Sequence, residues 1–154
     1  MTDPEVLQAL VDHPFGGGLG PALAEQVAAC AGLGEAAPGQ VLFREGGPAD
    51  TFYLVRAGRV ALEVPAPGGA HVVDTAHGGD VVGWSWAVPP HRWLFDARAT
   101  EPTTMVVVDA VCLRAACDRD PALGHAVLQR VLAVVSGRLH SARVRLLDLY
   151  GSPA

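Results

Sequence analysis

Residues 83–93 hold the side chains of this sequence that are best suited to ligand binding. The segment reads Gly-Trp-Ser-Trp-Ala-Val-Pro-Pro-His-Arg-Trp and contains all three tryptophans of the chain. Indole rings stack on planar molecules, and a guanidinium pairs with anionic groups such as phosphate. The pattern predicts a site in which Trp84, Trp86 and Trp93 hold a planar ligand while His91 and Arg92 hold an anion.

The same cluster has two other interpretations. The indoles can fill the space that a ligand would occupy, which leaves a packed pocket with no binding function. They can also form a patch that contacts another protein, because tryptophan is enriched at the centres of protein interfaces.

Catalysis and metal binding are disfavoured. Ser85, His91 and Asp96 are the three residue types of a hydrolase, but the segment lacks the second glycine of a Gly-x-Ser-x-Gly turn. His71 and His77 are spaced neither as a helical pair nor as a zinc finger. We therefore expect a protein that is not an enzyme, with no catalytic residues, no metal and no cofactor beyond a possible nucleotide-like ligand.

The composition indicates one domain with a sizeable core. The chain has 154 residues, of which 50% are hydrophobic, and its net charge of −5 disfavours a strongly basic nucleic-acid binder. All 11 basic residues are arginines. Residues 1–120 hold seven of them against 15 acidic residues, whereas residues 121–154 hold four against Asp148 alone. A basic end on an acidic body indicates a partner surface.

The cysteines and the hydropathy predict a cytoplasmic protein. Cys30, Cys112 and Cys117 are odd in number and have no patterned spacing, which argues against a disulfide scaffold and for a reducing compartment. Cys112 and Cys117 are expected to be small buried hydrophobic residues. No apolar run approaches the ~20 residues that a membrane span needs.

Hydrophobic periodicity predicts three regions. Residues 1–36 are expected to be helical, with a second helix that starts at Pro21 and ends at Gly32 and Gly34. Residues 37–109 contain short apolar runs at roughly ten-residue spacing with Gly and Pro turns between them, which is typical of antiparallel strands. Residues 110–154 return to helix, with Asp109 and Asp120 as N-caps. The predicted class is α+β: an antiparallel β-roll, or jelly-roll barrel, flanked by N-terminal helices and a long C-terminal helix.

This layout resembles the cyclic-nucleotide-binding domain family, which includes the effector domain of the catabolite activator protein. The turn in 38–46 (PGQVLFREG), the strand and hairpin in 48–60 (PADTFYLVRAGRV) and the segment 79–83 (GDVVG) are similar to the family's successive strands and turns. Segment 79–99 is similar to its phosphate-binding cassette, which Arg98-Ala99 leaves. The resemblance covers about residues 39–150.

The cassette departs from the family pattern. In the family, a glycine frees backbone N–H groups, a glutamate holds the ribose hydroxyl and an arginine pairs with the phosphate. Gly83 is present, but Trp84 replaces the glutamate, and counting back from Arg98 places Trp93 where the arginine should be. We therefore expect no ordinary cyclic AMP binding. The resemblance implies a ligand site made of Gly83, Trp84, Ser85, Trp86, His91, Arg92 and Trp93, with Arg143 of the last helix.

The last helix predicts an assembly. Apolar residues recur at three- and four-residue steps, which suits a partner helix: Leu128, Val131, Val135, Leu139, Ala142, Leu146 and Leu149. We expect a homodimer through residues 121–150, with Arg138, Arg143 and Arg145 beside the seam. The alternative is that this stripe folds back on its own barrel.

Two functions remain open at this point. The first is a regulatory, ligand-sensing module that passes a signal to a protein partner through its last helix; DNA binding by this chain alone is not expected, because only four residues follow Tyr150. The second is an accessory docking subunit of a larger redox enzyme complex, of the NAD(P)-dependent hydrogenase type, with which similar stand-alone domains are associated.

Overall fold

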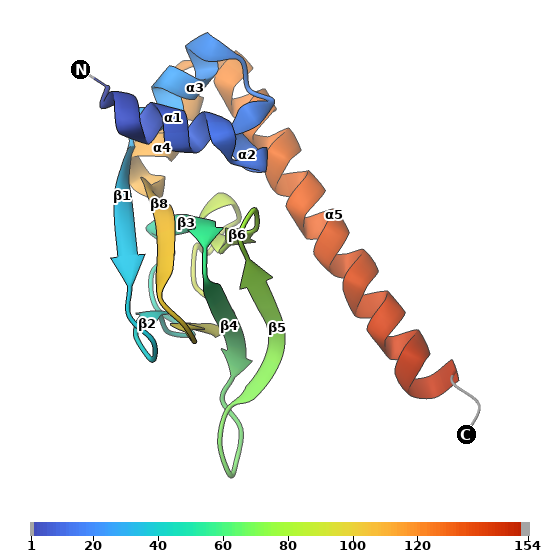
Figure 1. Ribbon diagram of the computed structural model, residues 1–154. Coiled ribbons are helices and arrows are strands. Elements are labelled where there is room, and N and C mark those ends of the chain that lie inside the picture. Colours follow the sequence, from blue (N-terminus) through green and yellow to red (C-terminus); the bar gives the residue numbers. More distant parts are fainter. Residues whose placement is uncertain (1, 152–154) are drawn as a thin grey trace.

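The computed structural model describes residues 2–151 and shows a β-roll with helices at one end and along one side (Figure 1). The helices are α1 (Pro4–Asp12), α2 (Pro14–Gly17), α3 (Pro21–Ala28), η1 (Ser85–Ala87, a single 3-10 turn), α4 (Ala110–Arg119) and α5 (Pro121–Gly151). The strands are β1 (Ala31–Ala36), β2 (Val41–Phe43), β3 (Thr51–Ala57), β4 (Arg59–Val64), β5 (His71–His77), β6 (Val81–Val82), β7 (Asp96–Ala99) and β8 (Thr103–Asp109). The predicted α+β class is confirmed.

Two four-stranded antiparallel sheets form the roll. Their strand orders are β1-β8-β3-β6 and β2-β7-β4-β5. Alternate residues of the strands point inward, so Phe52, Leu54, Val60, Leu62 and Val106 are each at most 1% exposed. The core therefore lies between the two sheets. Strand β5 is one of the two edge strands of the second sheet.

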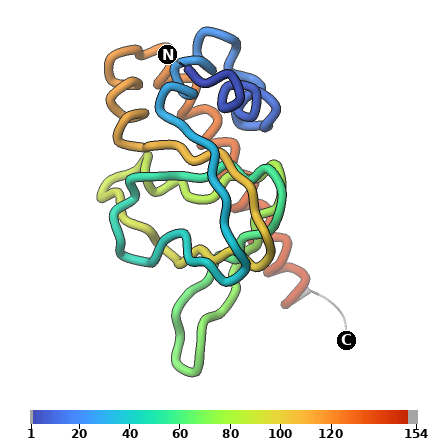
Figure 2. Tube along the Cα trace, turned by 60° about the vertical axis from the view of Figure 1, so that its left-hand side comes forward, coloured from blue at the N-terminus to red at the C-terminus, as the bar shows by residue number. Residues whose placement is uncertain are grey.

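Figure 2 shows the helices α1–α4 gathered at one end of the roll, while the loop between β4 and β5 extends from the opposite end.

Two predicted N-caps position the last two helices. The Asp109 carboxylate accepts a hydrogen bond from Cys112 N at 3.0 Å, and that of Asp120 accepts one from Ala122 N at 3.1 Å. From Pro121, α5 runs along the side of the roll past β5 (Figure 1).

The prediction that residues 1–36 are helical is wrong at its end. Residues 31–36 form β1, which pairs with β8 in the register Ala31↔Val108 to Ala36↔Thr103. Gly34, which we interpreted as part of a helix end, lies in this strand, where a Cβ would come within 2.6 Å of the Val107 side chain. Crowding across the sheet, rather than helix termination, explains this glycine.

The expectation that the cysteines form no disulfide is also wrong for one pair. Cys30 and Cys112 are bonded, with Cα atoms 5.6 Å apart, and 82 residues of sequence separate them. Asp109 N donates to Cys30 O at 2.8 Å, so the start of β1 lies against the first turn of α4. Cys117 has a free, half-buried thiol whose pKa is raised by burial.

Between residues 2 and 151, no helix is both long enough and apolar enough to cross a membrane.

Candidate functional site

The cassette begins at a sharp backbone turn after β6. Gly83 has φ +90°, and a Cβ at this position would lie 2.5 Å from Cζ3 of Trp93. Only glycine meets both demands without strain. The turn η1 follows, and the chain reaches β7 after the segment 88–95.

Two of the three indoles belong to the core. Trp86 is 2% exposed and stacks on Phe52 with ring centroids 4.7 Å apart. Trp93 is 4% exposed and stacks on Phe43 with ring centroids 3.8 Å apart. The six-membered ring of its indole lies against Gly83. The prediction that three indoles stack on a ligand is therefore corrected: two of the rings fill the interior, as in the packed-pocket interpretation.

Of the three tryptophans, only Trp84 lies at the surface of the cassette. It is half-buried, meets Phe95 edge to face at 6.0 Å, and carries the Arg138 guanidinium over its ring, with 5.7 Å between Cζ and the ring centroid. This distance is within the range of a cation–π contact. The residue that replaces the family's glutamate thus contacts the long helix α5.

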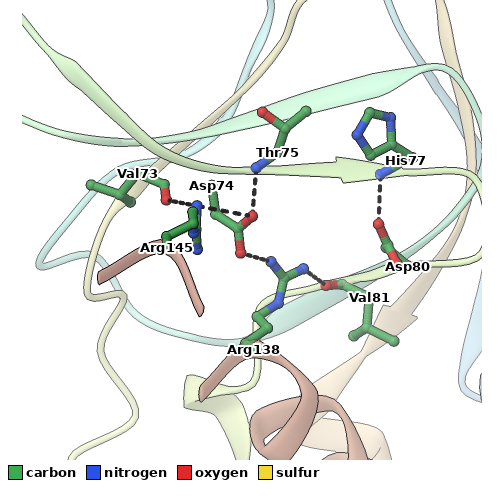
Figure 3. A network of polar contacts seen from close by, with 8 residues as sticks. All are labelled: Val73, Asp74, Thr75, His77, Asp80, Val81, Arg138 and Arg145. Carbon is green, nitrogen blue, oxygen red and sulfur yellow. Dashed lines mark hydrogen bonds and ion pairs between the residues drawn. The ribbon is translucent and has the colours of Figure 1, made fainter. Parts of the chain in front are cut away.

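The Arg138 guanidinium joins three parts of the molecule (Figure 3). Its Nη1 forms an ion pair with the Asp74 carboxylate of β5, and its Nη2 donates to Val81 O of β6 at 2.8 Å. The side chains of Arg138 and Asp74 are only 16% and 26% exposed, so water screens the pair weakly.

A second arginine of α5 reaches the same strand. Arg145 Nη1 donates to Val73 O at 2.7 Å and lies 3.9 Å from Oδ1 of Asp74 (Figure 3). We expected Arg138 and Arg145 beside a dimer seam, facing the partner or solvent. The structure places both against the chain's own β5, which leaves only Arg143 of the three without such a contact to β5.

The remaining predicted ligand residues do not converge on Trp84. Ser85 is buried, and the exposed Arg92 donates from Nη1 to Gly46 O at 3.4 Å. His91 is half-buried with φ +57°, and Arg143 is exposed on α5. Asp96 accepts hydrogen bonds from Glu45 N at 2.8 Å and from Arg44, both in the turn after β2. A ligand over Trp84 would therefore meet Arg138 and Arg145 rather than His91 and Arg92.

The Arg138–Asp74 pair separates two cavities between α5 and the roll. One, of about 520 Å³, has a lining of mixed polarity, which includes the polar residues Thr75, Asp80, Arg130 and Ser141. The other, of about 380 Å³, is apolar, and both members of the ion pair line both spaces. The lining of the apolar cavity consists of Leu62, Val73, Asp74, Trp84, Phe95, Val135, Arg138, Leu139, Ala142 and Arg145.

Sequence reasoning missed Asp74, which lies in no motif, and Phe95, which lies in segment 79–99 but matches none of the ligand-binding residue types of the family pattern. Arg138 did carry a signal, since a charged residue interrupts the apolar pattern of the long helix between Val135 and Leu139. Its partner could not be found, because 64 residues separate it from Asp74.

Comparisons with known proteins agree with the fold. Residues 34–120 match the profile of the cyclic nucleotide-binding domain. The chain is 32% identical over 119 residues to the HTH-type transcriptional regulator Cmr of Mycobacterium tuberculosis, an alignment that covers 77% of this chain and 47% of that protein. The chain thus spans about half the length of that regulator.

Solved structures are similar over most of the chain. A protein from Geobacter metallireducens, described as a cyclic nucleotide-binding protein, superposes with a TM-score of 0.78 at 28% identity and covers 91% of this chain and 100% of that one. A cyclic nucleotide-binding domain from Methylobacillus flagellatus superposes with a TM-score of 0.78 at 20% identity, covering 97% and 84%. This chain belongs to the cyclic nucleotide-binding domain family, a family of regulatory domains.

Proposed function

We propose that this chain is a non-enzymatic regulatory module that does not bind ordinary cyclic AMP or cyclic GMP. The observation that carries the proposal is the position of Arg138, whose guanidinium contacts β5, β6 and Trp84 at once. In this chain a side chain of α5 makes the contacts between the long helix and the cassette that a ligand would otherwise have to make.

A cyclic nucleotide would meet two obstacles here. The first is chemical: Trp84 and Trp93 stand where the family places a carboxylate and a guanidinium, so the ribose hydroxyl and the phosphate lose their partners. An unmet polar group in a buried site costs about 1–3 kcal/mol, and more when it is charged. The second is steric: the Arg138–Asp74 pair divides the space into cavities of about 520 and 380 Å³.

The output of the module is a homodimer through α5. Seven apolar residues follow alternating four- and three-residue steps, the spacing of a two-helix seam: Leu128, Leu132, Val135, Leu139, Ala142, Leu146 and Leu149. Leu132 is 67% exposed, whereas Val131, which we first placed in this row, is 8% exposed and faces the chain's own core. The five leucines of this row are each more than half exposed, which supports pairing with a second copy. Val135, Leu139 and Ala142 also line the apolar cavity, so the second copy would border that cavity.

Calorimetry with cyclic AMP tests the proposal. The wild type should show no binding at millimolar nucleotide. The variant Trp84→Glu/Arg138→Ala restores the carboxylate for the ribose hydroxyl and opens the cavity, but the phosphate still lacks its guanidinium, so this variant should bind cyclic AMP only weakly, in the millimolar range. The single change Arg92→Ala serves as a control and should behave as the wild type. Micromolar or tighter binding of cyclic AMP to the wild type would overturn the proposal.

A second candidate function is an accessory docking subunit of an NAD(P)-dependent redox enzyme. The supporting observation is a further set of apolar residues on α5 outside the seam, in which Val144 and Leu147 are 41% and 68% exposed. A dimer through the seven-residue row would leave these side chains in water. Under this hypothesis, Leu147→Glu should abolish co-purification with such an enzyme and leave the homodimer intact.

A further inference from the structure

The apolar cavity beside Trp84 has the size and lining of a small-molecule site. Its volume of about 380 Å³ lies in the range of about 300–1,000 Å³ that is usual for ligand pockets. Such pockets combine many apolar side chains with a few polar groups that orient the ligand. Here the polar groups are Asp74, Arg138 and Arg145, and all other lining side chains are apolar.

We propose that this cavity binds a flat aromatic molecule that carries a single carboxylate. The inference rests on the proposed function, because a nucleotide that displaced Arg138 would occupy the same space. Of the ligand-binding residues that the sequence indicated, only Trp84 lines this cavity.

The apolar side chains of the cavity favour an aromatic ligand. Trp84 and Phe95 meet at an interplanar angle of 74°, so together they form two walls of a corner. Leu62, which is 1% exposed, and Val135, Leu139 and Ala142 of α5 also line the cavity. A flat ring that enters this corner can contact apolar atoms on both faces, and about 25 cal/mol is gained for each Å² of apolar surface removed from water.

The charged side chains at the rim of the cavity favour a ligand with a single carboxylate. Asp74 bears one negative charge, which the Arg138 ion pair compensates. Arg145 adds a second guanidinium, held in place by its hydrogen bond to Val73 O, and its side chain is 52% exposed. These three side chains therefore carry one net positive charge. It matches a monoanion, and a planar carboxylate can accept two parallel N–H donors of a guanidinium.

The same count disfavours a phosphate. A terminal phosphate bears nearly two negative charges and would lie beside the Asp74 carboxylate, whose like charge repels it. Arg92, which the sequence indicated as the anion-binding residue, is exposed and contacts Gly46 O. It is absent from the cavity lining.

Calorimetry with 2-naphthoate and its uncharged amide, 2-naphthamide, tests the proposal on the full chain. The wild type should bind 2-naphthoate more tightly than the amide, and added salt should narrow the difference because the carboxylate lies near a half-exposed guanidinium. Arg145→Gln should reduce the affinity for 2-naphthoate about tenfold and change the affinity for 2-naphthamide by no more than about twofold.

A pair of variants on β5 tests the location. Val73→Trp places an indole in the cavity and should abolish binding of both probes. Val72→Trp changes the adjacent residue, which is 56% exposed and does not line the cavity, and it should bind as the wild type does. Both substitutions put a β-favouring residue in an exposed strand position, so both proteins should fold.

The outcomes separate this inference from the proposed function. No binding of 2-naphthoate by the wild type at millimolar concentration overturns the inference and leaves the cyclic AMP result untouched. If Val73→Trp and Val72→Trp lose the same affinity for the probes, the ligand does not bind in this cavity. If Arg145→Gln changes the affinity for both probes equally, the site does not recognise a carboxylate. If the wild type binds cyclic AMP and Val73→Trp abolishes that binding, the cavity is a nucleotide site, and both proposals fail.

Discussion

His13 is a buried residue between α1 and α2 whose ring state is set by its two partners. Phe15 N donates to Nδ1 at 3.0 Å, so Nε2 carries the proton, and it lies 3.1 Å from Asp80 O. The side chain is 5% exposed, and burial lowers the pKa of the imidazole below its usual 6.5. The ring therefore ties the first helices to the turn that leads into the cassette only while it is neutral.

This arrangement predicts an acid-labile contact. The unfolded chain takes up a proton at His13 near pH 6.5 and the folded chain only at lower pH, so the free energy of unfolding should fall as the pH drops below about 6.5. His13→Asn keeps the acceptor for Phe15 N but cannot titrate, and it loses the bond to Asp80.

Thermal unfolding between pH 7.5 and 5.5 measures the effect. The variant should be less stable by about 1 kcal/mol at pH 7.5 and approach the wild type at pH 5.5. The exposed His125→Asn is the matched control. A constant difference between His13→Asn and the wild type over this range would contradict the assignment.

At the scale of elements, the Cys30–Cys112 bond ties the start of β1 to the first turn of α4, which leads directly into α5. Closing a loop of 82 residues lowers the entropy of the unfolded chain, and loops of this length correspond to about 4 kcal/mol. Cys112→Ser should therefore reduce the free energy of unfolding by about that amount, and a dithiol reductant should bring the wild type close to the variant.

Urea unfolding with and without reductant provides the measurement. Cys117→Ser, which removes the free thiol, is the control and should respond to reductant as the wild type does. If oxidised wild type and Cys112→Ser unfold at the same urea concentration, the bond does not constrain the chain.

At the scale of the whole molecule, α5 is both the wall of the cavity and the proposed dimer seam. Leu132 and Leu147 are almost equally exposed, at 67% and 68%, but only Leu132 lies in the seven-residue row. Leu132→Glu would bury an unpaired charge in the seam, whereas Leu147→Glu places the same charge in solvent.

Light scattering at tens of micromolar should find the wild type and Leu147→Glu at twice the chain mass of 16.0 kDa, and Leu132→Glu at the chain mass. Leu132 does not line the apolar cavity, so a monomeric Leu132→Glu can also report whether 2-naphthoate binding needs the dimer. A monomeric wild type would exclude the homodimer.

Local patterns in the sequence were enough to predict the order of the elements. The caps at Asp109 and Asp120 and the long last helix follow from helical periodicity and capping chemistry, which act over a few residues. The loss of the family's carboxylate and guanidinium was likewise visible at Trp84 and Trp93. The strand β1 was missed because glycines such as Gly32 and Gly34 commonly end a helix, whereas within a sheet they allow close packing between strands.

The fate of the side chains was decided only by the tertiary structure. An indole shows the same pattern in the sequence whether it faces a ligand or stacks on Phe43 or Phe52, because the difference lies in which distant strand comes to rest against it. The pairs Arg138–Asp74 and Cys30–Cys112 join residues 64 and 82 positions apart, and no local periodicity encodes such contacts. They form when β5 and α4 reach their places in the folded roll, and they determine that the pocket of this chain is bridged by its own arginine.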